Sequence, residues 1–539
     1  MRHAVTRFRP LLLVLILALT LAACADEPEL GSVTPATAPA VSTNSPAAPS
    51  VPAAPEPPAE DLVDYAAYLE ETDCTELLGL LDLEFDLDEL GVSCGYLIAP
   101  EERSDPESAE VSLALAVIPS RSATPRPDPI IYLDGGPGGS ALFGIADWID
   151  SPLRDEYELI LFDQRGTGLS WPSLNCLEME EAEDDEANFV AAQACRDRLI
   201  DEGVNLNAYN SRANAADVAD LIAQLGYDEV NLLGISYGTR LAMTVLRDNA
   251  AGVRSVILDS SYPPNVNAYN EQALNAGLAI LAMLRGCADD PDCADAFPDL
   301  EQRFYSLIDL LDEEPILFEV EDEEGELVDV EVSGADLVSH ISDWLYITDL
   351  ISYIPLMIDE LDRSETATLQ FLYEESGAGF GRQDAAEGDL SDSEAMFYAV
   401  ECREEAPFST LNQARAQAAD LPTQLDEALL GSVENFFELC PIWDVASATA
   451  RERAPVASAI PTLILAGEYD PVTPPHWGLL AAQGLSNSYF YVLPGGGHAV
   501  IDASDCMMTI TKAFLDNPTR EPDARCLNEL TPFFAYELP

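Results

Sequence analysis

Near its middle the chain reads Glu229-Val230-Asn231-Leu232-Leu233-Gly234-Ile235-Ser236-Tyr237-Gly238-Thr239-Arg240. An apolar run stops at Gly-x-Ser-x-Gly, and a helical pattern begins immediately afterwards. This strand–turn–helix order is the context of a nucleophile elbow, in which a serine is held on a sharp, strained turn. Glycines are needed beside such a turn because it leaves no room for a Cβ. The stretch therefore predicts that Ser236 is a nucleophile at the carboxyl end of a buried strand.

A serine nucleophile needs a base to take its proton, and the chain has four histidines. His3 lies at the extreme N-terminus, and His340 lies in a region of helical patterns. His498 follows an apolar strand and the run Pro494-Gly495-Gly496-Gly497, whose glycines let the backbone bend the imidazole toward the serine. We predict His498 as the base, and His476 is the other candidate near a strand end.

The acid that orients the base should lie between serine and histidine in chain order, at the carboxyl end of a strand. Asp470 meets both conditions, and Asp259 is its rival at the end of another strand. An oxyanion hole needs two backbone N–H donors aimed at one point. We predict that these come from Tyr237, which follows the nucleophile, and from Gly136 in a Gly-Gly-Pro-Gly loop.

The charge and histidine content limit the possible ligands. The chain has 97 Asp and Glu against 25 Lys and Arg, a formal net charge of −72 at pH 7. This excess would repel a phosphate backbone, so we expect no nucleic-acid partner. Because so few histidines remain outside the predicted catalytic set, we expect no metal and no cofactor.

The N-terminus has the features of a secretory signal. Three arginines within the first nine residues precede the apolar run Leu11–Leu19, which is too short to span a membrane. The following Leu21-Ala22-Ala23-Cys24 resembles a bacterial lipobox, which implies cleavage before Cys24 and acylation of its thiol, with residues 1–24 as signal. Residues 25–60 are rich in Pro, Ala, Ser and Thr, which is typical of an extended tether.

The remaining ten cysteines are an even number, as expected for disulfides in an exported chain. They fall along the chain in five local couples, and we predict that each couple forms a disulfide. The predicted pairs are Cys74 with Cys94, Cys176 with Cys195, Cys287 with Cys293, Cys402 with Cys440 and Cys506 with Cys526.

Buried-strand patterns alternate with helical ones on both sides of the elbow, as at 130–133, 158–162, 253–259, 462–467 and 489–493. This alternation predicts an α/β fold with a doubly wound, mostly parallel sheet of about eight strands. Between 265 and 440 helical patterns dominate, with one acidic hairpin-like piece at 317–332. We predict a sheet core formed by 61–264 and 441–539, with 265–440 inserted as a mainly helical cap.

These motifs together resemble the α/β-hydrolase peptidases that include proline iminopeptidases and secreted bacterial tripeptidyl aminopeptidases. The resemblance runs from about Tyr65 to the C-terminus, and the last hundred residues look like the C-terminal region of the tripeptidyl aminopeptidases. It implies an α/β-hydrolase fold. Asp134 is a departure, because the iminopeptidases usually have His before the Gly-Gly pair, and it argues against narrow prolyl specificity. The resemblance is carried by Gly135-Gly136-Pro137-Gly138-Gly139-Ser140, Asp163-Gln164-Arg165-Gly166-Thr167-Gly168-Leu169-Ser170, Gly234-Ile235-Ser236-Tyr237-Gly238, Gly467-Glu468-Tyr469-Asp470 and Gly497-His498.

In this family acidic groups of the cap hold the free α-amine of the substrate, which makes the enzyme an exopeptidase. Val400-Glu401-Cys402-Arg403-Glu404 resembles the cap segment that carries such a group. The resemblance therefore implies Glu404 as the first candidate for the amine site and Glu401 as the second. Asp163 and Arg165 are expected to brace loops without a chemical role.

The expected function is that of a lipid-anchored, extracytoplasmic or secreted serine aminopeptidase, acting on peptides as a monomer and touching the membrane only through its anchor. Two alternatives stay open. A carboxylesterase or another non-peptide hydrolase could use the same scaffold, because a fold does not fix a substrate. A catalytically silent surface-binding lipoprotein is the alternative outside enzymes, and the complete set of Ser, His, Asp and glycine loops argues against it.

Overall fold

The computed structural model describes residues 67–539, apart from 82, 84, 106, 181, 183, 184, 322–326 and 377–389. The predicted signal, Cys24 and the tether lie outside the described residues. No helix in the part of the chain that is described is both long and apolar enough to cross a membrane.

The core is one nine-stranded sheet with strand order β1-β2-β3-β5-β4-β6-β7-β10-β11. Strands β5, β4, β6, β7, β10 and β11 run parallel to one another, whereas β1, β2 and β3 form an antiparallel flank whose strand β3 pairs antiparallel with β5. The predicted α/β-hydrolase fold class is confirmed, with one strand more than expected. The strands are β1 Tyr68–Thr72, β2 Ser93–Pro100, β3 Glu110–Ile118, β4 Ile130–Leu133, β5 Leu159–Phe162, β6 Val230–Ile235, β7 Val253–Asp259, β10 Thr462–Gly467 and β11 Ser488–Leu493.

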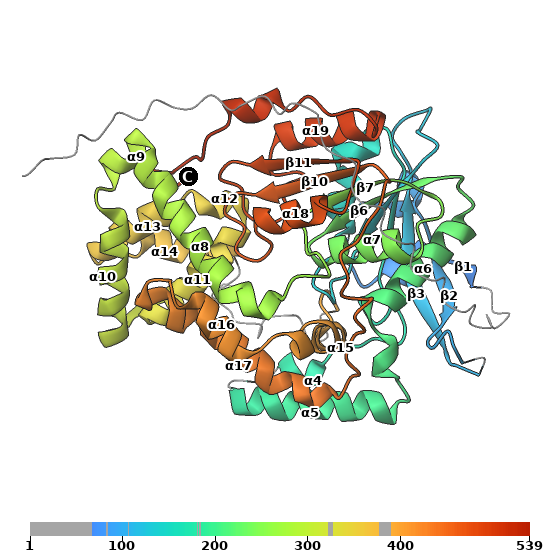
Figure 1. The fold of residues 1–539 in the computed structure, drawn as a ribbon, viewed down its shortest axis with the longest axis horizontal. Coiled ribbons are helices and arrows are strands. Elements are labelled where there is room, and N and C mark those ends of the chain that lie inside the picture. The colour runs from blue at the N-terminus through green and yellow to red at the C-terminus, as the bar shows by residue number, and fades with distance from the viewer. Residues whose placement is uncertain are drawn as a thin grey trace, which may run out of the picture. The chain divides into compact units, whose positions relative to one another are not determined.

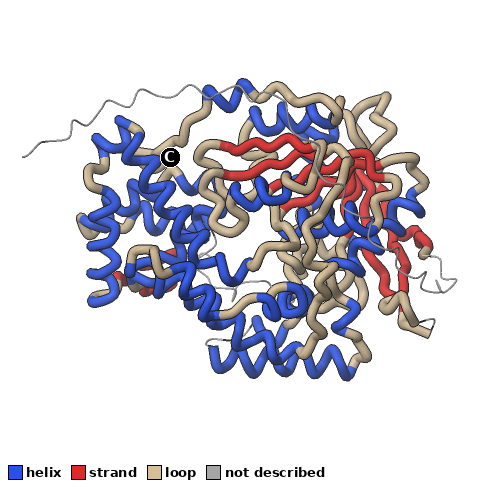
Figure 2. Tube along the Cα trace, in the orientation of Figure 1, coloured by secondary structure: helices blue, strands red, loops and turns tan. Residues whose placement is uncertain are grey.

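Helices cover both faces of the sheet, which explains why its central strands read as unbroken apolar runs (Figure 1, Figure 2). Every residue of β4, β5 and β10 is buried. One face packs against α6 (Ser211–Leu225), α7 (Tyr237–Asp248) and α18 (Pro475–Ala482). The other packs against α1 (Cys74–Leu78), α3 (Ile145–Asp150) and α19 (Asp505–Asp516). Shorter pieces are α2 Leu87–Leu90, α4 Leu177–Glu180 and the 3₁₀ turns at Pro152–Asp155, Leu206–Ala208, Ala406–Phe408 and Arg525–Glu529, and α5 spans Asp185–Asp201.

A mainly helical region lies between β7 and β10 in the chain, and in Figure 1 most of it gathers to one side of the sheet. It has an apolar core of its own, built around side chains such as Met283, Phe304, Ile341 and Trp344. The predicted hairpin is present as the antiparallel pair β8 (Ile316–Glu321) and β9 (Leu327–Val332). The boundaries 265 and 440 remain a prediction. The helices are α8 Ala268–Asp289, α9 Pro291–Ala296, α10 Leu300–Glu313, α11 Gly334–Tyr346, α12 Thr348–Ile351, α13 Ile354–Asp362, α14 Ala367–Ser376, α15 Glu394–Glu404, α16 Leu411–Ala418 and α17 Thr423–Trp443.

The five predicted disulfides are all present with the predicted pairing. Two of them lie at the margins of the sheet, where one ties α1 to β2 and another ties α19 to the 3₁₀ turn near the C-terminus. Two others lie in the inserted region, where one joins α8 to α9 and another joins α15 to α17. The bonds join Cys74 to Cys94, Cys176 to Cys195, Cys287 to Cys293, Cys402 to Cys440 and Cys506 to Cys526.

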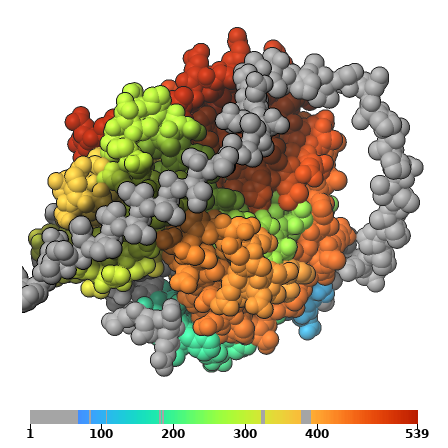
Figure 3. Space-filling view, turned by 60° about the vertical axis from the view of Figure 1, so that its left-hand side comes forward, coloured from blue at the N-terminus to red at the C-terminus, as the bar shows by residue number. Residues whose placement is uncertain are grey.

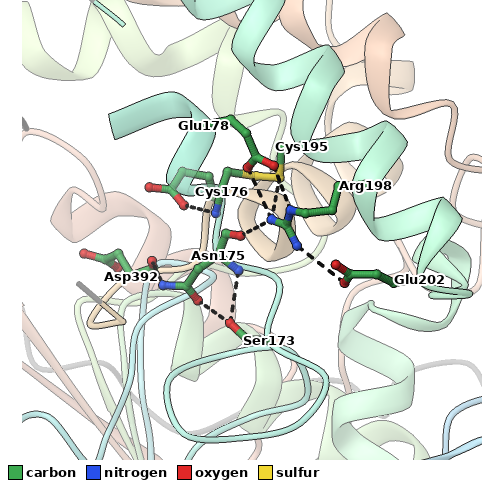
Figure 4. Close-up of a disulfide and its surroundings, with 9 residues drawn as sticks. Ser173, Asn175, Cys176, Glu178, Cys195, Arg198, Glu202 and Asp392 are labelled. Atoms are coloured by element: carbon green, nitrogen blue, oxygen red, sulfur yellow. Dashed lines mark hydrogen bonds and ion pairs between the residues drawn. A yellow bond between two sulfur atoms is a disulfide. The ribbon is translucent and has the colours of Figure 1, made fainter. Parts of the chain in front are cut away.

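The remaining disulfide, between Cys176 and Cys195, connects the start of α4 to α5 (Figure 4). Arg198 beside it is bonded to Glu178 and to the carbonyl of Asn175. The disulfide and this arginine therefore fix the loop that contains Asn175 against α5.

Candidate active site

Ser236 stands on a strained turn between β6 and α7. Its φ of 54° and ψ of −123° lie where non-glycine residues are rare, as a nucleophile elbow requires. The neighbouring glycines have no space for a side chain. A Cβ at Gly238 would lie 1.9 Å from the carbonyl oxygen of Leu133, and one at Gly234 would lie 2.4 Å from that of Gly238. The elbow predicted from the sequence is thus present, with its glycines in the sterically required places.

The imidazole of His498 is bonded to Asp470. His498 Nδ1 lies 2.9 Å from Asp470 Oδ2, and both side chains are buried. The same carboxylate accepts the Thr473 hydroxyl at 2.7 Å and the backbone N–H groups of Val472 and Thr473. Burial by itself would raise the pKa of Asp470, but His498 and these donors outweigh it and hold the pKa below its usual range. The carboxylate is therefore ionised and can stabilise an imidazolium.

The other ring nitrogen of His498 is suited to accept a proton. Nε2 is buried and has no hydrogen-bond partner among the described residues. The ring stacks on Tyr346 with centroids 4.2 Å apart, and the His498 N–H donates to the Tyr346 carbonyl at 2.9 Å. Helix α11 of the inserted region therefore helps to orient the base, a contribution that no motif in the sequence indicated.

The carboxylate of Asp259, the alternative orienting acid, is hydrogen-bonded to the backbone. Its carboxylate accepts the N–H groups of Val500 at 3.1 Å and Ile501 at 2.8 Å, just after His498. Burial raises its pKa to about 6 despite these two bonds. Its carbonyl also accepts the N–H of Ser236 at 3.0 Å. Asp259 thus shapes the loops that carry the serine and the histidine, whereas Asp470 is the group that contacts the imidazole.

The two remaining histidines that are described lie elsewhere. His476 is more than half exposed, and its Nε2 is 3.7 Å from Glu271. His340 lies on α11 and is 4.0 Å from Asp343. Neither contacts Asp470, so the placement favours His498 as the base.

The Gly-Gly-Pro-Gly loop lies against the nucleophile. A Cβ at Gly135 would come within 3.1 Å of the Ser236 Cβ, and Gly136 has a φ of +96° that favours glycine. Gly136 lines a pocket together with Ser236, and Tyr237 begins α7 directly after the serine. Gly136 and Tyr237, the predicted donors of the oxyanion hole, therefore both lie close to the nucleophile.

A segment just before α15 supports this loop. The Ser140 N–H donates to the Ser391 carbonyl at 2.9 Å, and the Ser393 N–H donates to the Gly138 carbonyl at 3.0 Å. Asn175 Nδ2 in turn donates to the Asp392 carbonyl at 3.1 Å, which anchors the segment next to the disulfide of α4 and α5 (Figure 4). The sequence carries no signal for this pairing, because it depends on how the inserted region sits on the core.

Asp163 and Arg165 brace the core as predicted. Asp163 accepts the Ser140 hydroxyl and the N–H groups of Leu142 and Leu169. Arg165 is fully buried and forms a two-pronged ion pair with Asp217. Both side chains hold loops behind the site rather than lining it.

The pocket above Ser236 has a volume of about 190 Å³, and its wall is aromatic and acidic. A second cavity of about 410 Å³ shares Gly136, Tyr269, Gln272 and Phe397 with it and is walled by α15 and α17. The orange surface in Figure 3 belongs to the part of the chain around and after residue 400, which includes α16 and α17. The first pocket is lined by Gly136, Ser236, Tyr262, Ala268, Tyr269, Gln272, Phe397, Glu401, Val472, Thr473 and Trp477.

The two candidates for the amine site differ in what they face. Glu401 is 2% exposed, lines the pocket with Ser236 and accepts the Tyr262 hydroxyl at 3.1 Å. Glu404 does not line that pocket, and its carboxylate accepts the N–H of Ser211 at 2.9 Å and the Ser211 hydroxyl at 2.8 Å. The placement therefore favours Glu401, the second candidate, over Glu404, the first.

The fold is that of the α/β-hydrolase class, and it places Ser236, Asp470 and His498 after the carboxyl ends of the parallel strands β6, β10 and β11, respectively. Residues 128–302 match the family described as alpha/beta hydrolase fold, and residues 431–526 match the family described as TAP-like protein. The chain therefore has the α/β-hydrolase fold and a C-terminal region that is similar to the TAP-like proteins.

Curated proteins that are similar to this chain include two peptidases and an esterase. The serine protease Hip1 of Mycobacterium tuberculosis is 25% identical over 474 residues, which are 81% of this chain and 87% of that protein. Carboxylesterase B of Mycobacterium tuberculosis is 26% identical over 483 residues, covering 80% of this chain and 86% of the relative. A tripeptidyl aminopeptidase of Streptomyces coelicolor is 28% identical over 199 residues, 32% of this chain and 36% of that protein. These relatives are hydrolases, with peptidases and an esterase among them.

Proposed function

We propose that this protein is a serine aminopeptidase that hydrolyses peptides from their free N-terminus. The observation that carries this proposal is the buried Glu401 carboxylate in the same small pocket as Ser236. An ionised carboxylate in such a place costs free energy, so the group either takes up a proton or binds a cation. The cation that every unblocked peptide offers is its α-ammonium group. The names of the Hip1 and tripeptidyl aminopeptidase relatives also support peptides as substrates.

In the proposed reaction the Ser236 hydroxyl oxygen attacks the scissile carbonyl while His498 Nε2 takes its proton. The oxygen of the tetrahedral intermediate becomes negative and is stabilised by the N–H groups of Tyr237 and Gly136. The C–N bond then breaks, and the imidazolium gives its proton to the leaving amine. Water, activated in the same way by His498, releases the acyl group from Ser236. Asp470 keeps the imidazole in the tautomer that has Nε2 free to accept.

Replacing Glu401 with Gln tests the amine site. A charge-assisted contact between ammonium and carboxylate in a partly dry pocket is worth a few kcal/mol, so we expect KM for a free tripeptidyl anilide to rise about 10- to 100-fold. Hydrolysis of the N-blocked anilide and of a p-nitrophenyl ester should change less than about threefold, because neither has the ammonium. The measurement is kcat and KM for all three substrates.

Glu404→Gln is the matched control, three residues away on the same helix. Because Glu404 is bonded to Ser211, this variant should affect stability more than the preference for free amines. Equal losses on blocked and unblocked substrates in Glu401→Gln would contradict the proposed aminopeptidase. A wild type that prefers the ester to every peptide would favour the carboxylesterase, the alternative that the Carboxylesterase B relative supports.

We also propose that the chain is an exported lipoprotein acylated on Cys24. The five disulfides support export, because such bonds persist in oxidising compartments and are rare in the cytosol. Cells expressing the wild type should incorporate a labelled fatty acid into the protein and retain it in the membrane fraction. Cys24→Ala should abolish the label. A wild-type protein that carries no label while it is exported would exclude the anchor.

A further inference from the structure

A buried charge cluster joins the helix of the nucleophile to the helix that carries Glu401. Arg240 lies on α7, one turn after Ser236, and is completely buried. Its guanidinium lies over the ring of Tyr262, 3.9 Å from the ring centroid. Its Nη2 is 2.5 Å from Glu405 Oε1, and its Nη1 is 3.7 Å from Glu404 Oε2. Acyl transfer as described above makes no use of this guanidinium.

The charges of the cluster do not balance. The end of α15 and the residue after it bring three buried carboxylates together, those of Glu401, Glu404 and Glu405. Two guanidiniums face them, because Arg453 also pairs with Glu405. Glu401 is the glutamate without a cationic partner of its own. Its carboxylate accepts a hydrogen bond from the neutral hydroxyl of Tyr262 and lines the pocket of Ser236. The cluster is thus complete when one cation enters the pocket.

Tyr262 connects the two ends of this arrangement. Its hydroxyl donates to Glu401 Oε2 at 3.1 Å, while its ring contacts the guanidinium of Arg240 and stacks on Trp477 with centroids 5.6 Å apart. Tyr262 and Trp477 both line the pocket. The position of the Glu401 carboxylate therefore depends on a ring that Arg240 holds in place.

We propose that Arg240 and Tyr262 are positioning residues for Glu401. They make Glu401 the one carboxyl group of the cluster that releases its proton when it binds the α-ammonium of the substrate. This inference rests on the proposed aminopeptidase. The exchange is balanced: the proton on the carboxylic acid leaves to solvent as the ammonium donates its N–H groups to the carboxylate. Arg240 and Arg453 compensate the two neighbouring carboxylates, so only one site remains for a cation.

The titration of Glu401 gives this exchange a pH dependence. Burial, together with the nearby charges of Glu405 and Glu404, raises the pKa of Glu401 to about 8, against the opposing effects of Arg240 and of the Tyr262 hydroxyl. Among the described residues, the other ionisable groups near this cluster include Tyr269 on α8, Tyr237 on α7, Tyr398 on α15 and Arg453. The α-amine of a peptide has a pKa of about 7.7 to 8.0, close to that of Glu401. Because binding needs the ionised carboxylate and the protonated amine together, 1/KM should peak near the mean of these two pKa values, at about pH 8.

The test is the pH of maximal 1/KM for the free tripeptidyl anilide, measured over a range of about pH 6 to 10 that brackets both groups. Arg240→Met removes a cation that lowers the pKa of Glu401, and Tyr262→Phe removes only the hydroxyl that does the same. We expect both variants to move the maximum toward alkaline pH, by about 0.5 to 1.5 units for Arg240→Met, because losing a nearby opposite charge shifts a pKa by about 1 to 3 units. Arg240→Lys should return the maximum toward that of the wild type.

Arg403→Met is the matched control, because Arg403 lies on α15, the helix of Glu401, but pairs with Glu452. It should leave the maximum unchanged, and the N-blocked anilide should show no such maximum in any variant. If Arg240→Met does not fold, the inference is tested with Tyr262→Phe alone, because that variant keeps the ring contacts with Arg240 and Trp477. A pH maximum that these variants leave in place, with KM raised equally at every pH, would overturn the inference. If Glu401→Gln also fails to discriminate between free and blocked substrates, the proposed function fails with it.

Discussion

Replacing Ser236 with Ala is expected to lower kcat by about 10⁶-fold on peptides and esters alike, as the loss of a nucleophilic serine does in other serine hydrolases. The reason is that the variant lacks the hydroxyl that forms the acyl intermediate in the proposed reaction. The variant should still fold, because alanine leaves the backbone of the elbow and its glycines unchanged. The measurement is single-turnover hydrolysis together with labelling by a fluorophosphonate probe.

Ser261→Ala is a suitable control for that experiment. Ser261 is as deeply buried as the site itself, but its hydroxyl has no hydrogen-bond partner among the described residues. This variant should keep both the labelling and the turnover. A wild-type protein that the probe does not label would instead favour the catalytically silent binding lipoprotein, whereas labelling that survives in Ser236→Ala would place the nucleophile elsewhere.

Replacing Asp470 with Asn is expected to lower kcat by about 10⁴-fold with folding retained. The amide cannot stabilise an imidazolium as the carboxylate does, and its NH₂ group would favour the tautomer with the proton on Nε2, which cannot accept from Ser236. Thr473 and the backbone donors around Oδ1 would still hold the side chain in place. Circular dichroism and the thermal midpoint establish folding, and kcat on the anilide gives the effect.

Asp259→Asn separates the two acids. It should weaken the two bonds to the Val500 and Ile501 N–H groups, so we expect a lower thermal midpoint and a smaller loss of kcat than in Asp470→Asn. Near-normal turnover in Asp470→Asn combined with inactivity in Asp259→Asn would transfer the orienting role to Asp259.

The sequence predicted those features that depend on local backbone chemistry. The elbow at Ser236, the glycine loops and the buried strands are each specified within a few neighbouring residues. The disulfide pairing followed from couples that are close in the chain, such as Cys287 and Cys293, which are six residues apart. In contrast, β1 was missed because Tyr68-Leu69-Glu70-Glu71-Thr72 is an exposed edge strand with two acids and no apolar alternation.

The choice between Glu401 and Glu404 could not be made from the sequence. Three residues on a helix differ by about 60° around its axis, so both side chains lie on one broad face. Which of them points at Ser236 depends on how α15 is rotated about its axis relative to α6 and α7. That rotation is set by contacts between distant parts of the chain. Examples are the contacts of Arg240 with Glu405 and of Glu404 with Ser211. The same limit applies to Tyr346, which reaches His498 from the inserted region.

Helix α7 starts at the nucleophile and supplies, one turn later, the guanidinium that balances the acidic end of α15. A substitution that tilts α7 would therefore disturb bond breaking and substrate choice simultaneously. Efforts to change which substrates are accepted should therefore begin at α17, whose Asn435, Phe436 and Leu439 line the larger cavity without contributing to this charge cluster.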